Sequence, residues 1–266
     1  MFKLFYLNLD FTYFYYLVDI MLLYFKGCTA REKLNSVSDS TIELLNLAGI
    51  EFEELSNESC CGSVLLRTGF KDEAIEQMKK NLKDLEGKTI LTSCAGCYKT
   101  LKYDYKDVLG IDLDVIHISQ LLDKLVKEGK LELKDENKFK NLKVTYHDPC
   151  HLGRHGGEFE APRNVIKRLA TLVEMKNIKE QSRCCGSGGG VKSAYGDLAN
   201  SIATLRIEEA YDTNADLIVT SCPFCKLHLS ENSDYLEVLD LSEFVLKILK
   251  NDESPIKKES INQKED

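Results

Sequence analysis

Short apolar runs alternate with longer amphipathic segments along most of the chain. From Met21 onward, runs of about four apolar residues, typical of buried strands, are separated by stretches with helical spacing. This alternation is the mark of β-α-β units, in which helices connect parallel strands and cover the sheet. The pattern therefore predicts an α/β protein with parallel sheets.

The first half of the chain contains four predicted strands, each followed by a predicted helix or turn. In the longest helix, apolar side chains recur on one face at Ala74, Ile75, Met78, Leu82 and Leu85. The predicted strands are 22–25, 50–55, 89–93 and 115–116, and the predicted helices are 38–48, 72–85, a segment after 97, and 119–126.

The second half repeats this order. Thr92-Ser93-Cys94 matches Thr220-Ser221-Cys222, and His117-Ile118-Ser119 matches Asp240-Leu241-Ser242. Strands are predicted at 144–146 and 217–220, and helices at 162–169 and 193–210. The sequence thus predicts two tandem, duplicated Rossmann-like domains with parallel sheets. The boundaries are a first domain at 21–128, a charged linker at 129–142, a second domain at 143–250 and a polar, disordered tail at 251–266.

Residues 1–20 precede the first repeat and need separate treatment. They are mostly apolar and, with the residues that follow, approach the ~20 needed to span a bilayer, but Asp10 and Asp19 make insertion costly. The end of the apolar run, Leu22–Phe25, aligns with the strand that enters Cys150, and a residue cannot belong to both a strand and a membrane helix. We expect an appendage or a mis-called start, with a signal anchor as the alternative.

Composition narrows the class of protein. The chain has 266 residues, of which 43% are hydrophobic and 29% charged, as in soluble globular proteins. Its net charge of -8 argues against nucleic acid as a partner. Without a convincing export signal, we expect a reducing, cytoplasmic location, where clustered thiols are usually metal ligands or catalytic groups.

All ten cysteines fall into two sets of five with similar spacing. Each set has a single cysteine, an adjacent pair followed by glycine, and a final C-x2-C pair after a predicted strand. Ligands of open α/β sheets bind at the carboxyl ends of the strands, so five thiols are expected to converge in each half. The first cysteine set is Cys28, Cys60, Cys61, Cys94 and Cys97, and the second cysteine set is Cys150, Cys184, Cys185, Cys222 and Cys225.

Several ligands are compatible with thiols in this pattern. Zinc takes four ligands, so five cysteines fit it less well than an iron–sulfur cluster, whose sulfide could accept from the N–H groups of turns at Gly62, Gly186 and Gly188. A redox disulfide between Cys184 and Cys185 would explain two of the five thiols. A phosphate loop at the glycine run lacks the Walker lysine.

Histidines gather beside the first cysteine of the second set. The stretch from His147 to His155 holds three histidines and Arg154 around Cys150. They could supply protons to a departing thiolate or hydrogen-bond a cluster, and we take His147 and His151 as catalytic candidates together with the adjacent thiols of this set. The matching stretch of the first half has no histidine, so the two halves are not expected to be chemically equivalent.

The complete pattern resembles the cysteine-rich domain of heterodisulfide reductase. The motifs that resemble its catalytic subunit are HDPCHLGR at 147–154, CCGSGGG at 184–190 and TSCPFC at 220–225. The thiol-oxidising subunit of thiol:fumarate reductase and iron–sulfur subunits of lactate, glycolate and glycerol-3-phosphate oxidising systems belong to the same wider family. The resemblance extends over nearly the whole chain from Leu22 to Leu249.

The resemblance implies two non-cubane [4Fe-4S] clusters, one on each cysteine set, and cleavage or formation of the disulfide between coenzyme B and coenzyme M. The chain lacks the ferredoxin-type C-x2-C-x2-C-x3-C-P segment of longer family members, so a ferredoxin-like partner subunit is expected to supply electrons, and membrane association is expected only through a partner. Two alternatives stay open: an electron-transfer subunit of a 2-hydroxy-acid or glycerol-3-phosphate dehydrogenase system, and a zinc-stabilised interaction module.

Overall fold

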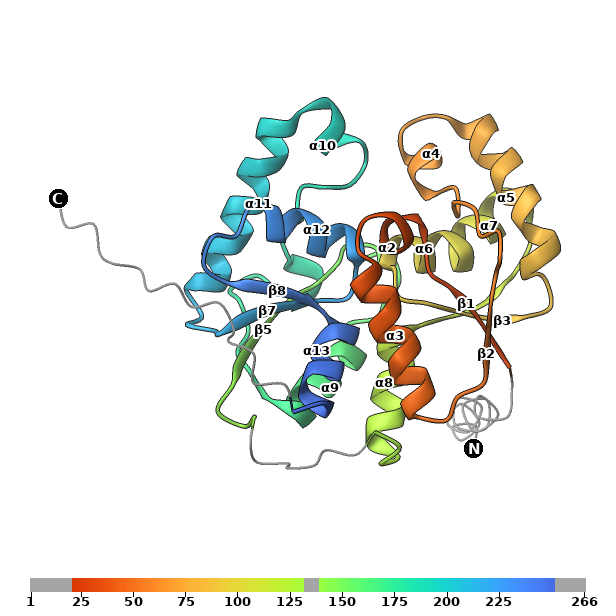
Figure 1. Cartoon of the computed structure of the whole chain (residues 1–266). Coiled ribbons are helices and arrows are strands. Elements are labelled where there is room, and N and C mark those ends of the chain that lie inside the picture. The colour runs from red at the N-terminus through yellow and green to blue at the C-terminus, as the bar shows by residue number, and fades with distance from the viewer. Residues whose placement is uncertain (1–20, 132–138, 252–266) are drawn as a thin grey trace, which may run out of the picture.

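Two four-stranded sheets lie side by side in the computed structural model, one in each half of the chain (Figure 1). The structure describes residues 21–131 and 139–251. The predicted appendage at 1–20, the central part of the predicted linker and all but the first residue of the predicted tail lie outside the described residues. Within those that are described, no helix has the length and apolar character needed to cross a membrane.

The first sheet is entirely parallel, with the order β2-β1-β3-β4. The two central strands are buried along their whole length, because helices cover both faces of a parallel sheet. This explains why their sequences are uninterrupted runs rather than alternating patterns. The strands are β1 (Leu22–Phe25), β2 (Phe52–Glu54), β3 (Thr89–Thr92) and β4 (Asp114–His117).

The second sheet repeats that topology, with the order β6-β5-β7-β8 and parallel pairing throughout. The duplicated α/β architecture expected from the sequence is thereby confirmed. The sequence analysis assigned neither edge strand of this sheet, β6 or β8. Strand β6 has two residues and therefore no apolar run of its own. The strands are β5 (Lys143–His147), β6 (Thr171–Leu172), β7 (Leu217–Thr220) and β8 (Glu237–Asp240).

The helices of the two halves also correspond. Those of the first half are α2 (Cys28–Glu32), α3 (Asn35–Leu47), α4 (Ser63–Arg67), α5 (Lys71–Leu85), α6 (Ala95–Lys99), a π-helical turn at Thr100–Asp104, α7 (Tyr105–Leu109) and α8 (Ile118–Lys127). Those of the second half are α9 (Glu160–Leu169), a 3-10 turn at Lys179–Gln181, α10 (Val191–Ala194), α11 (Gly196–Tyr211), α12 (Pro223–Glu231) and α13 (Leu241–Leu249).

The caps of two helices support the alignment of the repeats. His117 caps α8 and Asp240 caps α13, and each side chain accepts a hydrogen bond from the backbone N–H two residues later. Both helices complete a capping box, with Gln120 and Glu243 as the third residues. An imidazole and a carboxylate thus serve the same structural purpose in the two halves.

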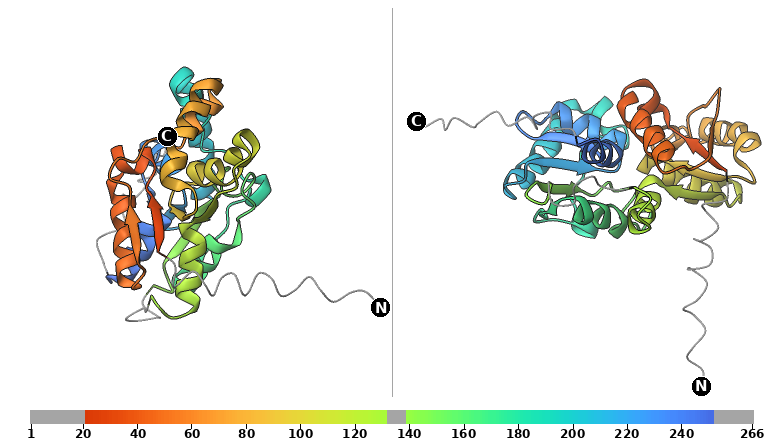
Figure 2. Two further views of the ribbon diagram at one scale, coloured as in Figure 1. Left: turned by 90° about the vertical axis from the view of Figure 1, so that its right-hand side faces the viewer. Right: turned by 60° about the horizontal axis from the view of Figure 1, so that its bottom comes forward.

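The halves are joined by two crosswise helix pairs, α3 with α13 and α8 with α9 (Figure 1). Exchanging the halves converts one pair into the other. Thr41 on α3 donates a hydrogen bond to Ser242 on α13 at 3.0 Å, and buried apolar side chains of both halves form one continuous core around the pairs. Because this core is shared, the two sheets hold a defined position relative to each other (Figure 2).

Candidate metal-cluster site

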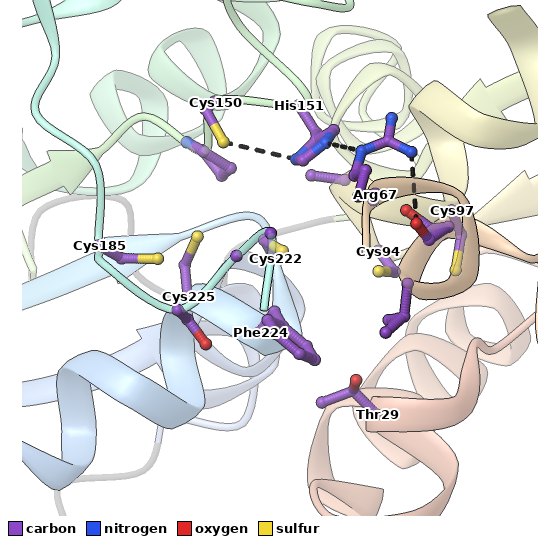
Figure 3. A pocket seen from close by; sticks show the side chains of 18 of the residues that line it. Thr29, Arg67, Cys94, Cys97, Cys150, His151, Cys185, Cys222, Phe224 and Cys225 are labelled. Carbon is purple, nitrogen blue, oxygen red and sulfur yellow. Dashed lines mark hydrogen bonds between the residues drawn. The ribbon is translucent and has the colours of Figure 1, made fainter. Parts of the chain in front are cut away.

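A single cavity between the halves is lined by all ten cysteines. Figure 3 shows cysteines of both sets around it. It contains about 910 Å³ of space that no atom fills, part of it open to solvent. The cysteines reach it from the carboxyl ends of strands and from the turns that follow, which is where an open α/β sheet binds ligands. The sequence indicated one set of five thiols in each half, and the structure brings the two sets together.

The ten thiols form a continuous series in which each lies close enough to the next for one to shift the pKa of the other. In the first set, neighbouring thiols interact in the order Cys28, Cys60, Cys61, Cys97 and Cys94. In the second set, the corresponding order is Cys150, Cys184, Cys185, Cys225 and Cys222. The two series meet at Cys94 and Cys222, each of which shifts the pKa of the other.

Glycine turns shape both adjacent pairs. Gly62 and Gly186 have φ of +92° and +86°, a region that residues with a side chain rarely adopt. Their backbone N–H groups donate to Cys60 Sγ at 3.4 Å and Cys184 Sγ at 3.3 Å. A Cβ atom at Gly186 would lie 2.5 Å from the carbonyl oxygen of Ala199 on α11, so this turn has no room for a side chain. Gly188 lines the cavity itself.

Because the thiols lie close together, they shift one another's pKa values in opposite directions. The thiols of Cys150 and Cys185 lower the pKa of the exposed Cys184 far below its usual range. The Cys184 thiolate raises the pKa of Cys185 to about 12, and the Cys60 thiol raises the pKa of Cys28 well above its usual range. Five thiols this close cannot all ionise without a compensating cation, so the donor set fits a bound metal cluster.

The predicted catalytic histidine His151 lies in the cavity wall and is held from the other half of the chain. Arg67 on α4 donates from Nε to His151 Nε2 at 2.6 Å (Figure 3). Its Nη2 pairs with Asp104 at 2.9 Å. The second ring nitrogen, Nδ1, lies 3.4 Å from Cys150 Sγ. Burial, reinforced by the positive charge of Arg67, lowers the pKa of His151 to about 4.

The other predicted histidine, His147, does not line the cavity. It ends β5 and is buried behind the second cysteine set, where Arg206 donates to its Nδ1 at 3.0 Å. Burial and the charge of Arg206 lower its pKa to about 3. Its Nε2 has no hydrogen-bond partner among the described residues. The nearby His155 is exposed and stacks at a tilt on His151, with 5.4 Å between ring centroids.

Arg67 and Arg206 were not among the residues that the sequence singled out. Each pairs with a histidine far away in the chain, 84 and 59 residues respectively, so no local motif could signal the contact. Phe224 and Thr29 also line the cavity (Figure 3). Phe224 lies inside the C-x2-C segment of the second set, and this position was the signal in the sequence that could have identified it.

Comparisons with known proteins agree with the repeat. The model of a cysteine-rich domain family named CCG matches residues 22–102 and again residues 144–230. One subunit of the dihydromethanophenazine:CoB–CoM heterodisulfide reductase of Methanosarcina acetivorans is 44% identical over 227 residues, which cover 81% of this chain and 55% of that one.

Two further relatives are more distant. One subunit of the fumarate reductase (CoM/CoB) of Methanothermobacter marburgensis is 37% identical, with 79% of this chain and 41% of that one aligned. The EtfAB:quinone oxidoreductase of Syntrophomonas wolfei is 32% identical, with 85% and 34% aligned. The chain thus spans about half or less of the length of these relatives. Since the family model matches most of the chain, once in each half, the chain belongs to the CCG cysteine-rich domain family.

Proposed function

We propose that the chain is an iron–sulfur oxidoreductase subunit that cleaves or forms a disulfide between two thiol coenzymes, of the coenzyme B–coenzyme M type. The observation that carries this proposal is the single cavity around which both five-cysteine sets gather. The names of two relatives, a heterodisulfide reductase subunit and a CoM/CoB-dependent fumarate reductase subunit, support the substrate class.

Each cysteine set would hold one [4Fe-4S] cluster of the non-cubane type. When bound, two such clusters supply the one-electron transfers that a two-electron bond requires. Cleaving one disulfide takes two electrons and two protons and releases two thiols. A site that faces both sets at once suits this reaction, because each half of the disulfide can lie next to one set.

The chain's own residues would position the disulfide and stabilise the sulfur that leaves. Arg67 has N–H donors and no acceptor, so His151 Nε2 must accept and the ring proton must sit on Nδ1, which faces Cys150 Sγ. His151 therefore presents an N–H to sulfur at the cavity wall. Phe224 and Val64 contribute apolar surface to the same cavity.

Electrons would arrive from a ferredoxin-like partner subunit, because cleavage of a disulfide consumes two electrons that a donor must supply. The relatives named as reductase subunits support a complex of this kind. We further propose that the subunit is cytoplasmic and reaches a membrane only through a partner.

The test is disulfide reduction by protein purified without oxygen. Reduced viologen dye should be oxidised when the coenzyme B–coenzyme M disulfide is added, with two dye molecules consumed and two thiols released per disulfide. His151→Leu should lower the rate by about tenfold or more, because it removes the N–H that faces the sulfur. His155→Leu is the matched control, since this exposed neighbour does not line the cavity.

An electron-relay subunit is the second candidate, and the similarity to an EtfAB:quinone oxidoreductase favours it. In that case the dye would reduce the clusters, but the disulfide would neither reoxidise them nor yield thiols. Protein that carries its full iron and still shows no thiol release with the heterodisulfide contradicts the main proposal and leaves the relay.

A further inference from the structure

We propose that His147 donates a fixed N–H hydrogen bond to the sulfur atoms of the second cysteine set, and that the cluster held there is for this reason easier to reduce than the cluster of the first set. The inference rests on the two clusters of the proposed function. It concerns a residue outside the cavity. It also gives the clusters of the two cysteine sets different reduction potentials, although the duplication would otherwise make the two sites alike.

Arg206 fixes the position of the ring proton on His147. Its Nε donates to His147 Nδ1 at 3.0 Å, and both side chains are buried with 1% exposure. A guanidinium has donors and no acceptor, so Nδ1 must be the nitrogen that accepts. In the neutral imidazole the remaining hydrogen then lies on Nε2.

The arginine cannot easily turn away from this contact. Its Nη1 donates to the carbonyl oxygen of Asn177 at 2.9 Å and pairs with Glu209 Oε2 at 2.6 Å. Glu209 is in turn held by Arg183, whose Nε lies 3.0 Å from its Oε1. Since these partners hold Arg206 in place, the orientation of the imidazole is set by the fold.

The imidazole of His147 lies close to two thiols of the second set. Nε2 has no hydrogen-bond partner among the described residues, although the side chain is buried. A ligand atom of His147 and the sulfur atoms of Cys185 and Cys225 all lie within 4.8 Å of one another. Since Nδ1 accepts from Arg206, Nε2 is the nitrogen left to donate to cysteine sulfur or cluster sulfide.

The same geometry excludes His147 as a metal ligand. A histidine that binds a metal through one nitrogen normally donates its other N–H to a carboxylate, a carbonyl or water. Here the other nitrogen already accepts from Arg206. If Nε2 also bound a metal, the ring would have to lose both protons. His147, Cys185 and Cys225 therefore do not form a histidine-ligated metal site, and His147 acts as a donor.

The described part of the first half has no such donor at the position equivalent to His147. Phe25 ends β1 and pairs with Thr92, just as His147 ends β5 and pairs with Thr220. Phe25 is as buried as His147 but offers no N–H. Hydrogen bonds to the sulfur atoms of an iron–sulfur cluster stabilise its more negative, reduced form and raise its reduction potential. The second cluster should therefore accept the first electron.

The test is a stepwise reduction of the whole protein with dithionite, followed by electron paramagnetic resonance. Iron and sulfide are measured first in every sample. Cys28→Ser and Cys150→Ser proteins assign each signal to its half, because each alters a ligand of one set. In the natural protein, the signal of the second half should change at the higher potential.

His147→Phe places in the second half the residue that the first half already has. The potential of the second cluster should then shift to a more negative value, while that of the first stays unchanged. His147→Gln, whose amide can still donate, should recover part of the shift. Phe25→Leu is the matched control for disturbed packing, since it alters the equivalent position without touching a donor, and it should leave the second potential unchanged.

The results of these measurements separate the inference about His147 from the proposed function. An unchanged second potential in loaded His147→Phe protein overturns the inference and leaves the proposed function intact, as does an equal shift of both clusters. Failure of His147→Gln to recover any part of the shift also overturns it, because a loss caused by packing alone would not depend on a donor. Natural protein that contains no iron and sulfide overturns the proposed function and this inference together.

Discussion

Gly186 forms the turn that places Cys184 and Cys185 at the cavity, and it offers the sharpest test at the scale of a single residue. Gly186→Val should remove about half of the bound iron, because a Cβ atom would lie 2.5 Å from the Ala199 carbonyl and the backbone has φ of +86°. The first cluster, held by cysteines of the other half, should keep its spectrum.

Gly189→Ala is the control for this change. Gly189 also has a positive φ, +64°, but nothing lies within 4 Å of the Cβ position, so a cost of about 1 kcal/mol without loss of iron is expected. Loss of both cluster spectra in Gly186→Val, or of neither, would show that the two sets do not bind their clusters separately.

His117 gives a prediction about pH. Burial lowers its pKa to about 4, so the folded chain holds it neutral while the unfolded chain protonates it below about pH 6.5. The unfolded state then binds more protons, and the free energy of unfolding falls as the pH drops. His117→Asn keeps a side chain that can cap α8 but cannot titrate.

The measurement is denaturant unfolding at pH 7.5 and pH 5.5. His117 should account for a loss of about 1 kcal/mol between these values in the natural chain, and the loss should be smaller by that amount in His117→Asn. Equal losses in the two proteins would show that His117 is not held neutral in the fold.

At the residue scale, the sequence indicated the ten cysteines and both glycine turns because their spacing repeats. It also indicated His147 and His151, but it could not separate their roles. That separation depends on Arg67 and Arg206, which approach from distant helices, and on the direction in which each imidazole is held. A contact between residues so far apart in the chain leaves no periodic signal.

At the scale of elements, β1 tests where the fold begins. It lies between β2 and β3 and is completely buried. A chain that begins at Met21 should be soluble and carry its full iron, whereas one that begins at Lys26 lacks β1 and should lose the first sheet. Circular dichroism and iron content distinguish them. Insolubility of the longer chain, or loss of half its iron, would show that residues 1–20 are needed.

Elements with a continuous apolar run were predicted accurately, as β1 and β7 illustrate. The central strands of a parallel sheet are buried on both faces, so their sequences are unmistakable. The helix expected at 193–210 is instead interrupted at Tyr195, where φ of −140° and ψ of 66° separate α10 from α11. Short pieces such as α4 and β6 depend on tertiary contacts and give little signal of their own.

At the scale of the whole molecule, the duplication predicted two similar halves but not how they meet. The crosswise pairs α3 with α13 and α8 with α9 create a shared core, and the cysteine sets consequently face one cavity. The apolar pattern of each half predicts the sheet of that half. The packing between the halves depends on apolar residues that cannot be told apart, in the sequence, from ordinary core positions. One cavity with two cysteine sets is the feature on which the proposed disulfide chemistry depends.

The metal and sulfide content of protein prepared without oxygen tests this account most directly. Two four-iron clusters predict about eight iron and about eight sulfide per chain, with a brown colour. Zinc in stoichiometric amount, with no iron and no sulfide, would contradict it and show that the two cysteine sets hold structural metal.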